Sequence, residues 1–184
     1  MAAVQASYPE ATVEGWATDE HRVGLQPIVG RVWARKGQRP IVCVQHRFQW
    51  RYVLACVHPA SGRTEWQFAS GIHSAVMSVA LEEFAAAVGA GPSKRLVLVL
   101  DQAGYHTSPQ LQVPDGIHLV LLPPYSPELQ PAEHLWHYTD QSLINAHFVT
   151  IDELEDILAD HCDRLQQQQE IIRSATRFHW WPAI

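Results

Sequence analysis

The stretch LVLVLDQAGYHTS, residues 96–108, joins five consecutive apolar residues to a carboxylate at Asp101. An unbroken run of Val and Leu is typical of a β-strand covered on both faces, as in the parallel part of a sheet. Taken alone, Asp101 would most simply begin a turn or cap a helix by accepting hydrogen bonds from nearby backbone N–H groups. The polar residues that follow predict a loop at the carboxyl end of this strand.

The segments around this stretch predict a mixed sheet. A second continuous apolar run, IHLVLLP at residues 117–123, predicts another parallel strand. Upstream, residues 12–70 contain short β-rich runs separated by turn-like stretches, which predicts an antiparallel meander joined by hairpins. These runs are TVEGWATD, GRVWA, PIVCVQH, WRYVLACVH and RTEWQFAS.

Helices are expected in three places. The first helix covers residues 73–88, which are rich in Ala and end at GAGP. A second helix is expected to begin near Pro131. A longer third helix is expected to begin after Thr150, a plausible N-cap with Glu153 at capping-box spacing. QQQQ at 166–169 is expected to form a solvated helix face. The apolar positions are Val76, Val79 or Ala80, Phe84 or Leu81, and Ala87 in the first helix, and Ile151, Leu154, Leu158, Cys162 and Leu165 in the last.

The composition is that of a folded domain in a reducing compartment. With 184 residues, 47% hydrophobic and 17% charged, the chain suits one domain, with a core over about 10–160 and a C-terminal helix and apolar tail over 150–184. Cys43, Cys56 and Cys162 have no CxxC spacing and favour neither a disulfide framework nor a cysteine zinc site. Neither a membrane span nor a signal peptide is indicated, so a cytoplasmic location is expected. A net charge of −6 argues against wrapping nucleic acid by bulk electrostatics.

A second informative stretch is LLPPYSPELQPAEHLW, residues 121–136. Its prolines hold the chain extended after the second apolar run, and Pro131 suits the first turn of a helix. Glu133 would then lie in that first turn, where a carboxylate commonly interacts with the helix dipole. The rigid loop would also hold this carboxylate in a defined place relative to the preceding strand.

Together these residues resemble a known family. DQAGYH followed by LLPPYSPELQPAEHLW is similar to the D-N-x-x-x-H and P-P-Y-S-P-x-L-N-P-I-E-x-x-W motifs of the DDE superfamily endonuclease domain, found in transposases of bacterial insertion sequences related to mariner elements. WATDEHRVGL and GRVWARKGQRP resemble that family's first-aspartate strand and the Trp-x-x-x-Gly segment after it. The order of expected elements, antiparallel strands first and parallel strands later with flanking helices, also resembles the α/β ribonuclease H-like mixed sheet.

The resemblance implies a site and an activity. Asp19, Asp101 and Glu133 would be the catalytic, metal-binding carboxylates, holding two Mg²⁺ or Mn²⁺ ions for DNA cleavage and strand transfer. If the strands that end at Asp19 and Asp101 are parallel neighbours, both carboxylates emerge at one edge of the sheet. This sequence departs from the family motif at Gln102, Gln130 and Ala132, and Thr139 and Asp140 stand where a Lys is frequent. The spacing of Asp101 and Glu133 is also a few residues shorter than usual.

Partners follow from the same resemblance. DNA is the expected substrate, with transposon ends recognised by a separate helix-turn-helix domain or protein, because residues before Asp19 are too few for one. A bacterial source and a homodimer are compatible with this reading. Two alternatives stay open: a general nuclease or ribonuclease H on the same fold, and a decayed, non-catalytic domain that serves in assembly.

Several further residues have two interpretations each. Glu20 is the alternative to Asp19 as a metal ligand, although it would point to the opposite face if the strand continued. His106 either orients a water or phosphate or is simply solvated. His134 and His137 form an HxxH pattern that favours surface or packed histidines over zinc. A basic cluster with Trp33 beside it either contacts DNA or forms a solvated turn; it comprises Arg31, Arg35, Lys36 and Arg39. The tail RFHWWPAI is expected to pack on the domain, with docking to a partner as the alternative.

Overall fold

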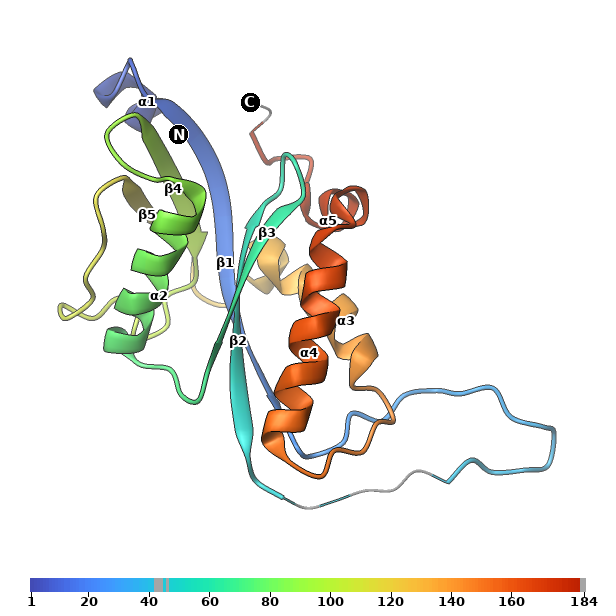
Figure 1. Cartoon of the computed structure of the whole chain (residues 1–184). Helices are drawn as coiled ribbons and strands as arrows, with labels where there is room; N and C mark the ends of the chain where they lie inside the picture. The colour runs from blue at the N-terminus through green and yellow to red at the C-terminus, as the bar shows by residue number, and fades with distance from the viewer. Residues whose placement is uncertain (42–44, 46, 183–184) are drawn as a thin grey trace.

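A five-stranded mixed sheet forms the centre of the computed structural model, which describes residues 1–41, 45 and 47–182 (Figure 1). The strand order is β3-β2-β1-β4-β5, with β1 antiparallel to β2, β2 antiparallel to β3, and β4 parallel to both β1 and β5. This confirms the predicted order, antiparallel strands first and parallel strands later. The strands are β1 (Thr12–Gly24), β2 (Trp50–His58), β3 (Arg63–Ala69), β4 (Lys94–Leu100) and β5 (Ile117–Leu121).

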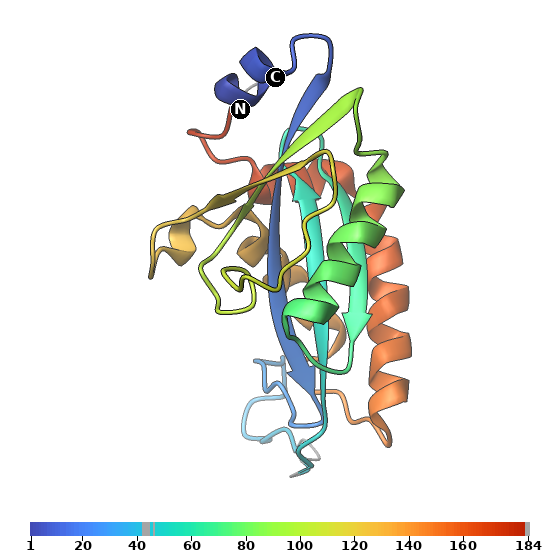
Figure 2. The same ribbon diagram turned by 90° about the vertical axis from the view of Figure 1, so that its left-hand side faces the viewer.

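Helices cover the two faces of the sheet unequally. One face carries α2, and the other carries α4 together with α3 and α5, as Figures 1 and 2 show. No helix in the described part of the chain has the length and apolar character needed to span a membrane. The helices are α1 (Ala2–Ser7), α2 (Ser74–Val88), α3 (Trp136–Thr139), α4 (Ile151–Gln166) and α5 (Gln169–Thr176), with 3-10 turns η1 (Pro127–Leu129), η2 (Pro131–Leu135) and η3 (Asp140–Ser142).

Two apolar clusters, one on each face, hold these layers together. Side chains alternate along β1, so Trp16 packs toward α2. There the rings of Trp16 and Phe84 pack edge to face, with their centroids 5.1 Å apart. Its neighbour Ala17 belongs to the opposite cluster, together with Leu154 and Leu158 of α4. The same alternation continues to Asp19 and Glu20 and sends these two carboxylates to opposite faces.

The predicted meander is only partly correct. TVEGWATD, WRYVLACVH and RTEWQFAS form β1, β2 and β3, with the expected hairpin between β2 and β3. GRVWA was expected as a strand, but residues 31–40 are all exposed and irregular, and Trp33 is completely exposed. This prediction is wrong, and among the described residues no strand lies beside this segment to supply hydrogen-bond partners. PIVCVQH, with Cys43, lies largely outside the described residues.

The predicted helices form, with local differences. In α2 the buried face includes Ala80, Leu81 and Phe84, whereas the alternative Val79 is 55% exposed. Thr150 caps α4 by accepting from the Glu153 N–H at 3.1 Å, and the expected stripe is buried at Leu154, Leu158, Cys162 and Leu165. The helix expected at Pro131 begins as η2 and becomes α3. The glutamines are exposed or half-buried as expected, but the helix ends at Gln166 and α5 starts at Gln169.

Two strands differ in extent or cover from expectation. β1 continues to Gly24, so Asp19 lies inside the strand and its backbone pairs with Ala55 of β2, rather than ending the strand. β5 is an edge strand whose Val120 and Leu121 remain 45% and 43% exposed, so it is not covered on both faces. Both differences arise because a strand's length and cover depend on its neighbours.

The C-terminal tail folds back onto the domain. Trp181 is 6% exposed, belongs to the same cluster as α4, and lies close to Gly15 of β1, where an added Cβ would be 3.3 Å from its ring. The rings of Phe178 and His134 pack edge to face, with their centroids 4.8 Å apart. The expected packing is thus confirmed for Phe178 and Trp181, whereas Trp180 is 40% exposed.

Candidate active site

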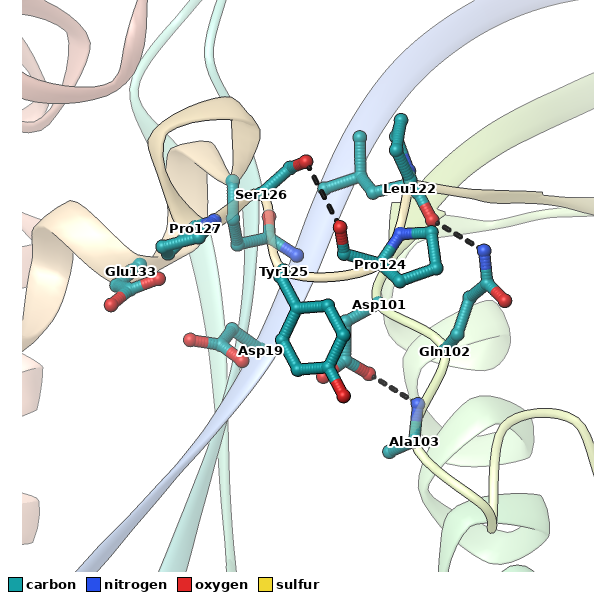
Figure 3. Close-up of a pocket in the computed structure, with 12 residues that line it drawn as sticks. Asp19, Asp101, Gln102, Ala103, Leu122, Pro124, Tyr125, Ser126, Pro127 and Glu133 are labelled. Carbon is teal, nitrogen blue, oxygen red and sulfur yellow. Dashed lines mark hydrogen bonds between the residues drawn. The ribbon is translucent and has the colours of Figure 1, made fainter.

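A pocket of about 500 Å³ lies where β1, the end of β4 and the proline-rich loop after β5 meet (Figure 3). Asp19, Asp101 and Glu133 all line it, although 32 positions separate the last two in the sequence. The remaining wall is largely apolar. It consists of Gln102, Ala103, Leu122, Pro123, Pro124, Tyr125, Ser126, Pro127 and Gln130.

Asp19 is held on the α3 side of β1. The Trp136 indole donates a hydrogen bond from Nε1 to Asp19 Oδ2 at 2.7 Å, and the His21 ring stacks on Trp136 at 5.0 Å. Burial raises the pKa of Asp19 from 3.8 to about 6; the charges of Glu20 and Glu133 add to the rise, and the Trp136 hydrogen bond opposes it. Asp19 is therefore a carboxylate whose negative charge is poorly compensated by the protein.

Asp101 follows β4 directly and lies beside Asp19 because the two strands are parallel. The last paired residues are Ala17 and Val99, two positions before each aspartate. The side chain of Asp101 is 55% exposed, and its Oδ1 accepts a hydrogen bond from the Ala103 N–H at 2.9 Å. The predicted side-by-side arrangement of these two strands is thus confirmed.

Glu133 reaches the pocket from η2, where it is exposed. Gln130, just before this turn, donates to the Thr18 carbonyl oxygen at 2.9 Å and caps the turn by accepting from the Ala132 N–H. Gln102 donates to the Leu122 carbonyl oxygen at 2.8 Å and joins the loops that follow β4 and β5. The two glutamines that depart from the family motif therefore connect the three segments that carry the carboxylates.

The donor set fits hard divalent cations. Carboxylate oxygens are preferred by Mg²⁺ and Mn²⁺, and the raised pKa of Asp19 reflects negative charge that a cation would offset. Among the described residues, no three His, Cys, Asp or Glu side chains form a ready-made ligand set for a single ion. An open arrangement suits Mg²⁺, which retains several waters and also uses substrate oxygens.

The two auxiliary candidates lie behind the pocket. Glu20 points to the face opposite Asp19, as its position in the strand predicts, and His106 contacts both Glu20 and Asp101. Burial disfavours the charged form of His106, but its hydrogen bonds and the charges of Glu20 and Asp101 outweigh burial and raise its pKa. His106 is 4% exposed and is therefore not the solvated histidine that was the alternative.

The basic cluster lies apart from the pocket. Arg31, Arg35, Lys36 and Arg39 are exposed on the segment that leaves the body of the domain after β1, and none of them lines the pocket (Figure 1). The base of this segment is fastened by two hydrogen bonds between Gly30 and Asn145, at 3.1 and 3.2 Å. His134 and His137 are exposed and contact aromatic rings, in line with the surface interpretation.

Sequence reasoning missed four residues of this site. Trp136 was visible as the last letter of the second motif, three positions after Glu133, but its contact with Asp19 spans 117 positions. Gln102 and Gln130 were noted only as departures from that motif. Tyr125 was visible only as the Tyr of the P-P-Y-S-P part of the same motif; it is completely exposed at the pocket and adopts a φ of 57°, in the left-handed region that non-glycine residues rarely occupy.

Comparison with known proteins identifies the family. The model of the DDE superfamily endonuclease family matches residues 15–155. A relative in Sinorhizobium fredii, described as uncharacterized protein y4pE/y4sA, is 37% identical over 114 residues, which cover 61% of this chain and 80% of that protein. The family match over residues 15–155 spans all three candidate carboxylates.

Solved structures of Mos1 transposase have the same fold. The Mos1 strand transfer complex aligns with a TM-score of 0.55 at 15% identity, covering 96% of this chain and 59% of that chain. The Mos1 mariner paired-end complex with Mn aligns with a TM-score of 0.57 at 16% identity, covering 96% and 60%. The chain thus spans about 60% of the Mos1 chain, and its sheet is ribonuclease H-like, as predicted. The chain belongs to the DDE endonuclease superfamily.

Proposed function

We propose that this chain is the catalytic domain of a DDE transposase that cleaves DNA and joins the resulting 3′ end to a target. The observation that carries the proposal is the convergence of Asp19, Asp101 and Glu133 on one pocket from three separate segments. The family match supports the same reaction class. Enzymes of phosphoryl transfer act mainly by positioning the reactants and stabilising charge, and they need little covalent chemistry from the protein. Carboxylate ligands held in an open pocket suit that task.

Asp19, Asp101 and Glu133 are the proposed ligands for two Mg²⁺ or Mn²⁺ ions. When bound, such ions activate the attacking water or hydroxyl and stabilise the leaving oxygen. Trp136 maintains the orientation of Asp19, while Gln102 and Gln130 hold the loops in register. The segment from Leu122 to Pro127 forms one side of the pocket.

DNA is the proposed partner. Recognition of the DNA sequence is proposed to be the task of a separate domain or protein. Structures with this fold include Mos1 complexes described as a strand transfer complex and as a paired-end complex with a transposon end. A helix-turn-helix domain or protein would supply recognition of the transposon ends, and a homodimer would bring two ends together. The net charge of −6 agrees with a division of labour in which this domain supplies chemistry rather than affinity.

The direct test is metal-dependent nicking by the purified chain. Supercoiled DNA, a transposon-end duplex and an RNA–DNA hybrid are incubated with Mn²⁺, Mg²⁺ or EDTA. We expect nicks in DNA only with a divalent ion, and joining of a free 3′ end to a second duplex. Cleavage confined to the RNA strand of the hybrid would instead support a ribonuclease H activity, and inactivity on every substrate would support the assembly role.

Metal binding is expected to stabilise the fold. Saturating Mn²⁺ at about 100 times its dissociation constant contributes about 2.7 kcal/mol, because the ion binds only the folded site. The melting temperature should rise with Mn²⁺ in the wild type and in Asp115→Asn, whose carboxylate pairs with Arg95 away from the pocket. The rise should be absent in Asp101→Asn. Equal rises in all three proteins would contradict a specific site.

The isolated chain is expected to bind DNA weakly and without useful sequence preference. A few phosphate contacts give non-specific dissociation constants of about 10⁻⁴ to 10⁻⁶ M at physiological salt. Replacing Arg35, Lys36 and Arg39 together should weaken binding to every sequence alike and reduce the slope of log affinity against log salt by up to about 3. The measurement is a salt titration with transposon-end and scrambled duplexes. A preference above about tenfold would show that these residues contain a specificity element.

A further inference from the structure

Behind the pocket, on the face of β1 opposite Asp19, lies a buried polar cluster made of Glu20, Tyr105 and His106. His106 Nε2 lies 3.1 Å from Glu20 Oε1, and the Tyr105 hydroxyl donates to Glu20 Oε2 at 2.9 Å. The side chains of His106 and Glu20 are 1% and 4% exposed. Both oxygens of this buried carboxylate contact side chains of the cluster, and Glu20 does not line the pocket.

The cluster reaches the pocket through a single contact. His106 Nδ1 lies 2.8 Å from Asp101 Oδ1, the same oxygen that accepts the Ala103 N–H. An ionised carboxylate oxygen only accepts hydrogen bonds, so His106 donates to Asp101 in the tautomer that carries its proton on Nδ1. The contacts of His106 and of the Ala103 N–H are both made to Oδ1, and no described residue forms a hydrogen bond with Oδ2 of Asp101, so Oδ2 can serve as a ligand.

The geometry points to a positioning role for Glu20 and His106. We propose that Glu20 fixes the His106 ring, and that His106 in turn holds Asp101 in the orientation that binds a divalent cation. This inference rests on the proposed function, since it concerns the same carboxylate. Carboxylate and histidine partners behind metal ligands are a general means of orienting those ligands, and their loss typically weakens metal binding about 10- to 100-fold.

A purely structural role predicts a different outcome. The cluster also connects β1 to the loop after β4, so its removal would lower stability even if it did nothing for Asp101. Glu14 offers a matched control: it lies on the same strand and the same face as Glu20, is half-buried, and pairs with Lys94 and Trp16 away from the pocket. Glu14→Ala should lower stability without any change in metal affinity.

The experiment measures Mn²⁺ affinity by calorimetry on the folded full chain, with melting temperature recorded separately. Glu20→Ala and His106→Ala are expected to bind Mn²⁺ about 10- to 100-fold more weakly than the wild type. Glu20→Gln, which keeps an oxygen for His106, should remain within about threefold of the wild type. Tyr105→Phe removes only the hydroxyl and keeps the ring, so it should fold and weaken Mn²⁺ binding a few-fold even if the alanine variants do not fold.

Each outcome decides between the two roles. Weaker Mn²⁺ binding by Glu20→Ala, His106→Ala and Tyr105→Phe, with near-normal binding by Glu20→Gln and Glu14→Ala, supports positioning. Wild-type affinity in all folded variants of the cluster, while Asp101→Asn loses binding, overturns the positioning role and leaves the proposed function intact. A wild-type chain whose Mn²⁺ binding does not depend on Asp101 overturns both.

Discussion

Asp101→Asn is expected to reduce metal-dependent DNA cleavage by about 10³-fold or more. Asp101 follows β4 directly, lines the pocket with Asp19 and Glu133, and has one carboxylate oxygen free for a ligand. An amide preserves the size and the acceptor for Ala103, but it removes the negative charge that attracts a divalent ion. Metal-ion catalysis contributes several kcal/mol of transition-state stabilisation, and about 4 kcal/mol corresponds to about 10³ in rate.

The measurement is the single-turnover rate of nicking with Mn²⁺ at a concentration that saturates the wild type. Asp115→Asn is the control, because this aspartate is exposed, pairs with Arg95, and does not line the pocket. We expect the control to cleave at the wild-type rate. Comparable activity in Asp101→Asn would show that the chemistry takes place elsewhere in the molecule.

Asp19→Asn is expected to abolish the proposed DNA cleavage and yet stabilise the metal-free fold at neutral pH by about 2 to 3 kcal/mol. The pKa of Asp19 is raised by burial to about 6, so its ionised form is disfavoured in the folded state relative to the unfolded chain. The difference from 3.8 corresponds to about 3 kcal/mol, which partial exposure reduces. Asparagine carries no charge and retains an acceptor for the Trp136 indole.

The sign of this effect gives a pH dependence. The folded state holds the Asp19 proton more tightly, so the stability of the wild type falls as pH rises from about 4 to about 6 and then levels off. The advantage of Asp19→Asn should therefore be absent below pH 4 and complete above pH 6. Urea denaturation in EDTA across this range measures it.

Glu14→Gln provides a control of opposite sign. Although burial opposes the effect, the contacts of Glu14 with Trp16 and Lys94 lower the pKa of its carboxyl. Removing that charge should therefore destabilise the fold at neutral pH. A destabilised Asp19→Asn would mean that the protein already compensates the charge of Asp19.

Local features of the sequence predicted most of the regular elements. The apolar runs before Asp101 and Pro123 became parallel strands, the helical spacing after Thr150 became α4, and the Thr150 cap formed as expected. In each case the deciding residues are neighbours in the chain or lie within a few turns of a helix. Such patterns report which face of an element is buried, because hydrophobic periodicity follows the geometry of that element.

The same patterns did not reveal which elements would become partners. GRVWA has strand-like residues but pairs with no strand in the part of the chain that the structure describes. By contrast, β1 continues past Asp19 because β2 lies beside it as far as Gly24. Strand formation requires hydrogen-bond partners from elsewhere in the chain. A sequence window that contains only one of the two strands carries no information about that pairing.

The candidate site shows the same division. By itself, the sequence selected three carboxylates that line one pocket, through two motifs and their family resemblance, and it predicted that Glu20 and Asp19 face opposite sides of a strand. Only the tertiary structure decided that Trp136 holds Asp19 and that His106 links Glu20 to Asp101. The contact between Trp136 and Asp19 joins residues 117 positions apart, and that between His106 and Glu20 joins residues 86 positions apart. The physical reason is that alternation along a strand depends on local backbone geometry, whereas a hydrogen bond between distant residues depends on how the whole sheet and its helices pack.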